Sequence, residues 1–333
     1  MHAESNFSAV KNNLFFVVGC GRSGTTLLKT ILNAHPQITI PHETFFFNMI
    51  VPRGDSDSMS SDQKIDRIVS RWWIKESGVS AQDLNHALAD KEASWKNLLI
   101  ALLAAQASKK EVVCFGEKTV GHLQFSKQLL DTYPGCRIIQ IIRDPRAVVA
   151  SFRSAKVGSN FVAKIAADWQ LAYEVDQELA DSTRYLRVKF EDLILHSSST
   201  AKEICQFLKL QYNPEMLQFH KRADKGFSRE QSHHENTTKE IFTSGLNTWK
   251  NKLTKNSLGL IESRLGQPMN DLGYELENVQ VWFPDLQLHA SALAEIASKY
   301  LVRRPMKLLK SLRIASRQSK EEKQIDVGTS NPT

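Results

Sequence analysis

The chain has 333 residues, of which 41% are hydrophobic and 24% charged, so we expect a soluble globular protein with room for one large α/β domain. It has no run of about 18 apolar residues, which excludes a membrane-spanning helix, and because residues 1–13 are polar we expect no signal peptide. The formal net charge is +7, but residues 299–320 hold eight Lys or Arg and no acid, so the rest is near neutral and we expect no nucleic-acid partner.

A glycine-rich segment lies near the N-terminus between two apolar runs. Residues 14–18 are typical of a strand, residues 19–26 read Gly-Cys-Gly-Arg-Ser-Gly-Thr-Thr, and residues 27–34 are typical of a helix. A strand, a glycine loop and a helix N-terminus in this order can hold a phosphate through backbone N–H groups and the helix dipole. The segment therefore predicts a site for a phosphate-like anion.

This loop departs from that of a P-loop NTPase. Gly19 and Gly24 keep the G-x-x-x-x-G spacing, but Thr25 stands where such an enzyme has lysine. The positive charge comes earlier, at Arg22. We therefore expect an anion site that does not work in the manner of an ATPase.

The remaining pattern alternates strands and helices. Strands are predicted at 37–40, 111–115, 137–142 and 185–188. Helices are predicted at 123–133, 145–153, 161–181 and beyond 200, with two or three more between 63 and 107, and a polar loop is predicted at 224–247. This alternation favours an α/β, P-loop-like three-layer fold with a central parallel sheet and helices on both faces. We assign residues 1–285 to this domain and residues 286–333 to a helical, basic tail that ends in disorder.

The four cysteines show no pattern of a redox or metal site. Cys20, Cys114, Cys136 and Cys205 are scattered, with no Cys-x-x-Cys and no histidine at ligand spacing. We expect buried, reduced thiols in a cytoplasmic protein. The consecutive residues His233, His234 and Glu235 indicate a solvated loop, and no metal site is predicted.

Polar candidates follow several predicted strands. Ligands of parallel sheets bind at the carboxyl ends of the strands. The 19–26 loop, Glu43, Lys118 and Arg143 all fall at such ends. We therefore expect these groups to meet at one edge of the sheet.

Several motifs together resemble those of sulfotransferases that use 3′-phosphoadenosine 5′-phosphosulfate (PAPS). Residues 22–27, Arg-Ser-Gly-Thr-Thr-Leu, match the family's 5′-phosphosulfate loop, and Arg143 with Ser151 eight residues later matches its 3′-phosphate motif. Residues 117–119 resemble its Lys-Thr-Pro segment, with Val120 in place of proline.

Two further segments extend the resemblance to about residues 13–275. Residues 187–193 are similar to the family's Arg-Val-x-Tyr-Glu-Asp-Leu segment, with Phe190 in place of tyrosine, and residues 245–250 are similar to its Gly-x-x-x-Trp-Lys segment. In style the motifs are closest to those of the protein-tyrosine, carbohydrate and bacterial sulfotransferases.

The resemblance implies PAPS as co-substrate, without a metal. The donor has two anionic ends, so it needs two anion sites, and the planar guanidinium of Arg143 suits a phosphate. An ion pair with Asp144 or with another acid nearby is the alternative role for Arg143. The implied donor-binding residues are Gly21, Arg22, Ser23, Gly24, Thr25, Thr26, Arg143, Ser151, Trp249 and Lys250.

Sulfuryl transfer is an in-line displacement that depends on positioning and on charge stabilisation. We expect Arg22 and Lys118 to stabilise the leaving phosphate oxygen, although Lys118 as a surface lysine paired with Glu117 is an alternative. A general base must take the acceptor's proton. Glu43 and His42 compete for that role, and the resemblance to protein-tyrosine and carbohydrate sulfotransferases favours Glu43.

The predicted function is sulfuryl transfer from PAPS to a hydroxyl or amine of a carbohydrate, tyrosyl peptide or small metabolite. A P-loop small-molecule kinase and a non-catalytic nucleotide-binding protein are the alternatives. Residues 45–47 (three Phe) and 72–73 (two Trp) are candidates to line the acceptor pocket. Residues 299–320 place apolar and basic residues at helical spacing, which fits either peripheral membrane contact or packing on a protein surface, so we expect a cytoplasmic protein with possible membrane contact.

Overall fold

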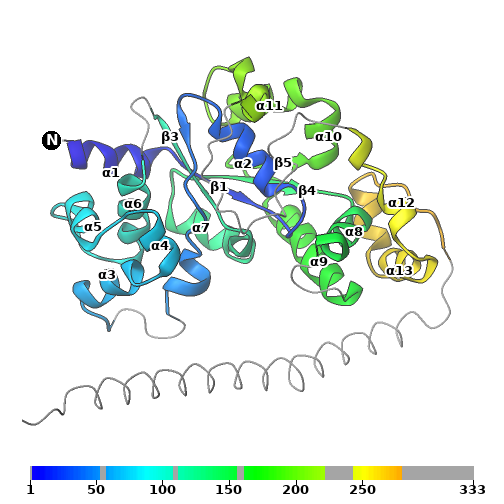
Figure 1. Cartoon of the computed structure of the whole chain (residues 1–333), viewed down its shortest axis with the longest axis horizontal. Helices are drawn as coiled ribbons and strands as arrows, with labels where there is room; N and C mark the ends of the chain where they lie inside the picture. The colour runs from blue at the N-terminus through cyan, green and yellow to red at the C-terminus, as the bar shows by residue number, and fades with distance from the viewer. Residues whose placement is uncertain (1, 53–57, 108–111, 156–160, 222–242, 280–333) are drawn as a thin grey trace, which may run out of the picture.

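Five parallel strands form one sheet in the order β2–β3–β1–β4–β5 (Figure 1). They are β1 (Leu14–Val18), β2 (Ile38–Thr39), β3 (Cys114–Lys118), β4 (Arg137–Ile142) and β5 (Tyr185–Lys189). The computed structural model describes residues 2–52, 58–107, 112–155, 161–221 and 243–279. Because β1 lies between β3 and β4, the segments that follow these three strands meet at one edge of the sheet.

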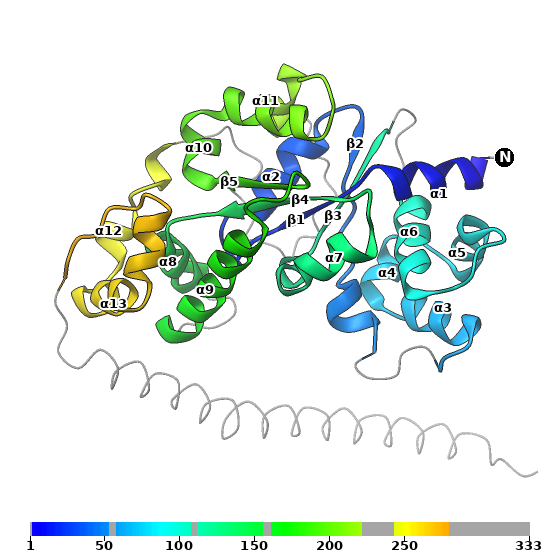
Figure 2. The same ribbon diagram turned by 180° about the vertical axis from the view of Figure 1, so that it is seen from behind.

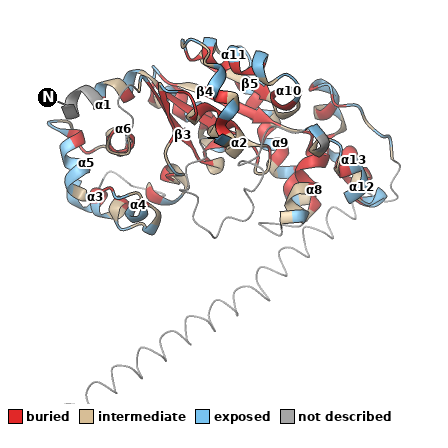
Figure 3. Ribbon diagram, turned by 45° about the horizontal axis from the view of Figure 1, so that its top comes forward, coloured by how far each residue is buried: buried red, intermediate tan, exposed pale blue. Residues whose placement is uncertain are grey.

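Alternate residues of the central strands enter two hydrophobic cores, one on each face of the sheet. Phe15 and Val17 of β1 pack in the core that contains residues of α2 (Thr25–Asn33) and α11 (Ser197–Phe207). Phe16 and Val18 belong to the other core, with residues of α7 (Ser126–Thr132) and α9 (Val162–Leu179). The strands are buried between helices whose outer sides are exposed (Figure 3). The predicted three-layer α/β fold is confirmed.

Two groups of helices lie at opposite ends of the sheet, as the two opposite views show (Figures 1 and 2). The first group is α1 (His2–Asn12), α3 (Ser61–Val69), α4 (Trp72–Glu76), α5 (Ala81–Leu88) and α6 (Trp95–Ala105). The second is α8 (Pro145–Ala155), α9, α12 (Trp249–Lys252) and α13 (Lys255–Asp271). Shorter elements are α10 (Phe190–Leu195), the π-helix η1 (Phe46–Ile50) and the 3₁₀ helices η2 (Val120–Phe125), η3 (Pro214–Lys221) and η5 (Thr243–Gly245).

The structure corrects one predicted element and adds another. The strand expected at 111–115 lies at Cys114–Lys118, so Glu117 and Lys118 belong to a strand and not to the loop after it. The sequence pattern ended the strand too early because two adjacent charged residues are untypical of a buried strand. The sequence does not predict α1 either; buried Phe7 and Val10 anchor this otherwise polar helix.

Four helices, α3 to α6, occupy the region where two or three were expected. All four cysteines are buried and unpaired, as predicted. Over the described residues, no helix is both long enough and apolar enough to cross a bilayer. Residues 224–242 of the predicted polar loop and the predicted tail at 286–333 lie outside the described residues.

Candidate functional site

The glycine loop and the end of β4 lie side by side, because β1 and β4 are hydrogen-bonded neighbours. Arg143, the first residue after β4, donates from Nη1 to the carbonyl oxygen of Arg22 at 3.2 Å. Arg22 in turn donates from Nε to Oγ of Ser151 at 3.1 Å, and Ser151 lies on α8. The structure thus brings together three predicted donor-binding residues that are far apart in sequence.

Arg143 is a largely buried cation whose hydrogen-bonding capacity is not used up. Its guanidinium carbon lies 4.2 Å from the ring centre of Phe190, and its Nε has no hydrogen-bond partner in the described part of the chain. Burial lowers the pKa of Arg143, whereas Glu191 and Asp144 act in the opposite direction. The carboxylate of Asp144 binds Arg146 at 2.8 Å. Among the described residues Arg143 forms no ion pair with Asp144 or with another acid, so that alternative finds no support there.

The loop offers a second unsatisfied polar atom and an uncapped helix end. Ser23 is fully buried, and its Oγ has no partner among the described residues. Helix α2 begins at Thr25 without a side-chain cap and without an acid in its first turn. Unpaired N–H groups at a helix N-terminus carry partial positive charge, so this end of α2 attracts an anion.

The loop's backbone conformation explains one of its glycines. Gly24 has φ 98°, a left-handed conformation that side chains disfavour. A Cβ at Gly24 would lie 2.4 Å from the ring of Phe190, so that ring closes against the loop. Arg22 also has a positive φ, 67°, which the loop must hold in place.

A second charged cluster lies at the carboxyl end of β3, the strand beside β1. Lys118, which is 4% exposed, forms an ion pair with Glu43. The predicted catalytic residues Glu43 and Lys118 are thus in contact, and the alternative of Lys118 as a surface lysine paired with Glu117 is wrong. His42 is accessible to solvent, but partial desolvation of its ring by neighbouring groups lowers its pKa, as do the charges of Lys29 and Lys118.

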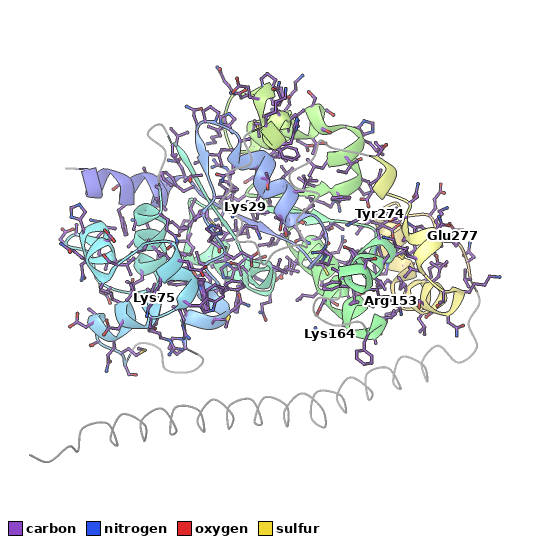
Figure 4. All side chains as sticks on the ribbon, viewed as in Figure 1. Lys29, Lys75, Arg153, Lys164, Tyr274 and Glu277 are labelled. Carbon is purple, nitrogen blue, oxygen red and sulfur yellow. The ribbon has the colours of Figure 1, made fainter. Side chains whose placement is uncertain are left out.

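Lys29 joins this cluster from α2, although the sequence does not single it out. Its Nζ donates to the carbonyl oxygen of Pro41 at 2.7 Å. Burial and the charge of Lys118 lower the pKa of Lys29 to about 7, against the opposing effect of Glu43 and Glu117. Lys29 lies on α2 near the middle of the molecule, whereas Lys75 lies with α4 and Glu277 lies near α12 and α13 (Figure 4).

Glu117 points into the protein and not towards Glu43. It is 1% exposed and receives hydrogen bonds from Thr44, Thr119 and His122. Burial raises the pKa of this carboxyl, but His122 and the two threonines outweigh that effect and hold it at about 2. The sequence pattern does not indicate this role, because Thr44 lies 73 residues away in the chain and His122 lies on η2.

Trp249 and Lys250 lie beside α8 but make no direct contact with the loop among the interactions of the described residues. Trp249 is buried against Ala147 and Ala150, with the guanidinium carbon of Arg146 4.1 Å from its ring centre. Lys250 pairs with Glu277 at 2.8 Å. Their donor-binding role stays a prediction.

Aromatic residues surround the backbone next to Glu43. The indole N–H of Trp73 donates to the carbonyl oxygen of Thr44 at 3.0 Å, and Phe45 meets the ring of Trp73 edge-on. Trp72, which contacts Trp73, is 66% exposed. Phe46 is buried and belongs to the core, so it cannot contact an acceptor.

Comparison with known proteins adds independent findings. A family model described as "Sulfotransferase family" matches residues 15–214. Protein-tyrosine sulfotransferase A of Caenorhabditis elegans is 25% identical over 221 residues, covering 64% of this chain and 54% of that protein. Protein-tyrosine sulfotransferase 2 of Gallus gallus is 26% identical over 224 residues, covering 65% and 56%. The chain thus spans about half the length of these curated relatives.

Solved structures share the fold. The sulfotransferase domain from the Synechococcus PCC 7002 olefin synthase aligns with a TM-score of 0.57 and 18% identity, covering 79% of this chain and 95% of that one. The sulfotransferase domain from the curacin biosynthetic pathway aligns with a TM-score of 0.55 and 18% identity, covering 79% and 98%. These likenesses support the predicted fold class.

Gly24→Ala should lower the free energy of unfolding by about 3 kcal/mol, because a left-handed backbone and a clash with Phe190 act together. Gly78→Ala is the matched control: φ is 77° there, but no atom lies within 4 Å of the added Cβ. That variant should lose only about 1 kcal/mol. Urea denaturation measures both, and equal losses would show that the contact with Phe190 has no effect.

The stability contributed by Glu117 should depend on pH. Its pKa in the folded protein, about 2, lies below the ordinary 4.5, so the contribution is complete above about pH 4.5 and is lost as the pH falls towards 2. In urea denaturation between pH 7 and pH 3, Glu117→Gln should therefore show a shallower acid-induced loss than the unmodified protein. Exposed Glu203→Gln serves as control and should keep the original slope. A Glu117→Gln profile parallel to the original would contradict the assignment.

Proposed function

The chain belongs to the sulfotransferase family, and on this premise we propose that it transfers a sulfuryl group from PAPS to a hydroxyl or amine acceptor. One observation carries the proposal: Ser23 Oγ and Arg143 Nε are buried polar atoms without a partner in the described residues, beside an uncapped helix N-terminus. Buried polar atoms are normally satisfied, so these two indicate a missing anionic ligand.

The residues present fit a donor with two anionic ends. The loop residues 21–26 and the start of α2 would hold the phosphosulfate end, and Arg143 with Ser151 would hold the 3′-phosphate. When bound, PAPS supplies the sulfuryl group and a phosphate as leaving group. Arg22 contacts both Arg143 and Ser151, so its guanidinium lies where it could bind either anionic end of the donor.

Glu43 and Lys118 are suited to the transfer itself. Glu43 is a partly exposed carboxylate that can accept the acceptor's proton, whereas its partner Lys118 is buried on β3. The ammonium of Lys118 holds the carboxylate in place and can stabilise negative charge as it develops nearby. Glu43 is favoured over His42 as the base, because His42 is exposed and makes no comparable pair with a site residue in the described structure.

A kinase function is less well supported. A P-loop kinase uses a lysine at the position of Thr25 to reach the transferred phosphate. The nearest cation on α2 is Lys29, and it binds the Pro41 carbonyl oxygen. The family assignment points in the same direction.

We propose a tyrosyl peptide or protein as the acceptor. The relatives in Caenorhabditis elegans and Gallus gallus are protein-tyrosine sulfotransferases. The aromatic surface of Phe45, Trp73 and exposed Trp72 next to Glu43 suits a phenol ring. Carbohydrate and small-metabolite acceptors are the competing outcomes of an acceptor screen. A cytoplasmic location and membrane contact through residues 299–320 stay predictions.

Adenosine 3′,5′-bisphosphate (PAP), the donor without its sulfuryl group, should bind as tightly with EDTA as without it, and more tightly than ATP. Arg143→Met should weaken binding about 10- to 100-fold, the cost of losing charge-assisted hydrogen bonds to a phosphate. Exposed Arg264→Met is the control and should bind normally. Isothermal titration calorimetry measures each affinity, and a requirement for Mg²⁺ with a preference for ATP would favour the kinase alternative.

Glu43→Gln should reduce the turnover of a tyrosine-containing peptide with PAPS by about 100- to 10,000-fold, because the amide cannot take the phenol proton. PAP affinity should stay within about twofold, since Glu43 acts on the acceptor. Mass spectrometry of the peptide follows the reaction. Glu178→Gln, on a surface ion pair with Lys127, should leave turnover unchanged. Full turnover by Glu43→Gln, or loss of PAP binding with it, would refute the base assignment.

A further inference from the structure

Side chains bind the four consecutive backbone N–H groups that follow Glu43. In chain order these N–H groups donate from Thr44 to Glu117 Oε1, from Phe45 to Thr119 Oγ1, from Phe46 to Thr44 Oγ1 and from Phe47 to His122 Nε2, at 3.3, 3.2, 3.2 and 3.3 Å. The first N–H groups of a helix have no partner within it, and here η1 begins at Phe46. The first two N–H groups of η1 thus find acceptors in the hydroxyl of Thr44, just before η1, and in the ring of His122 on η2.

The carboxylate of Glu117 determines which atom donates in each of these hydrogen bonds. The other three acceptors each donate their own proton to its carboxylate: Thr44 Oγ1 at 2.9 Å, Thr119 Oγ1 at 2.6 Å and His122 Nδ1 at 2.7 Å. An ionised carboxylate can only accept hydrogen bonds. Each hydroxyl and the imidazole must therefore turn a proton towards Glu117 and a lone pair towards the backbone N–H groups.

The cluster is fully enclosed, which makes its polarity hard to reverse. Thr44, Thr119 and His122 are each 0% exposed, and Glu117 is 1% exposed. Because Nε2 of His122 accepts from the N–H of Phe47, the ring directs the N–H of Nδ1 towards Glu117. Burying a charge costs free energy unless all of its hydrogen bonds are made, so this cluster stabilises a single backbone conformation.

Both sides of Glu43 are held in this way. Before it, the Pro41 carbonyl oxygen accepts from Lys29. After it, Phe45 is in the left-handed region at φ 50°, a strained conformation for this residue that needs support from its surroundings. The Thr44 carbonyl oxygen is bound by Trp73 as well. The backbone at Glu43 therefore has little freedom to move.

We propose that Glu117 is a positioning residue that, through Thr44, Thr119 and His122, fixes the backbone carrying Glu43 opposite Lys118. The inference rests on the proposed function, in which Glu43 is the general base. Adjacent residues of β3 then act on the same segment: Glu117 binds its backbone and Lys118 binds its carboxylate.

Residue-resolved hydrogen exchange of the full chain with PAP tests the structural half without relying on turnover. Thr119→Val removes the acceptor for Phe45 and should speed exchange there at least about tenfold. Glu117→Gln places an amide N–H₂ towards Nδ1 of His122, so the ring must carry its proton on Nε2 instead. Nε2 can then no longer accept the hydrogen bond from the N–H of Phe47, so exchange at Phe47 should also rise. Thr200→Val is the matched control, a buried threonine with one hydrogen bond, to Asp192, and should leave residues 44–47 unchanged. Unchanged exchange at Phe45 and Phe47 in the first two variants overturns the proposal.

A double-mutant cycle tests the catalytic half with PAPS and a tyrosine-containing peptide. Thr119→Val and Glu117→Gln should each lower kcat about tenfold or more with KM for PAPS and Kd for PAP nearly unchanged, because they displace Glu43 and not the donor. In the Glu43→Gln background they should add no further loss, since they act through that carboxylate. Losses that multiply in that background show a general structural role and overturn the proposal. If Glu43→Gln alone keeps full turnover, the proposed base fails, whereas normal kinetics of Thr119→Val beside an inactive Glu43→Gln overturns this inference alone.

Discussion

The placement of β1 between β3 and β4 is the constraint on which both halves of the site depend. Hydrogen bonding of β1 to β4 sets Arg143 beside the glycine loop, and hydrogen bonding of β1 to β3 sets Lys118 at the same edge. Each strand is short and buried, so neither end can shift without exposing core residues on both faces. The hydrogen-bonded strands thereby fix the relative positions of side chains that lie more than a hundred residues apart in the sequence.

Charge is distributed in opposite ways in the two halves. Beside the glycine loop, Arg143 has an aromatic ring and a carbonyl oxygen as neighbours, and it forms no ion pair among the described residues. The neighbouring carboxylate of Asp144 binds Arg146 instead. At the end of β3, the cation Lys118 is paired with Glu43. Under the proposed function, the first half would receive the anionic donor and the second the neutral acceptor group that gives up a proton.

Local patterns in the sequence were sufficient for the glycine loop and for β4. Residues 138–142 are isoleucine except for Gln140, and the loop's glycines and Arg22 lie within six consecutive residues, so both could be predicted from near neighbours. Strand β3 could not be placed correctly from the sequence, because two adjacent charged residues are typical of a loop. Only the folded structure shows that Thr44 and His122 bind Glu117 and that Glu43 binds Lys118.

Lys29 and the group around Glu117 were missed for the same reason. The bond from Lys29 to Pro41 spans 12 positions, and the bonds from the N–H groups of residues 44, 45 and 47 to this group span 73 to 75, so no spacing rule relates these pairs. The motif resemblance identified Glu43 and Lys118 as candidate catalytic residues but carried no information on what holds them.

The alternation of Glu117 and Lys118 along β3 has a consequence for how the chain reaches its native form. Neighbouring residues of a strand face opposite sides, so a slip of one position in one direction would place the ammonium of Lys118 against His122. A slip in the other direction would place the carboxylate of Glu117 against that of Glu43. Either misaligned chain would hold a charge without its counter-charge, a buried cation in the first case and two like charges in the second. The correct register of β3 is therefore required both for stability and for an intact site, so a molecule with β3 in the wrong register would not be a stable, inactive protein.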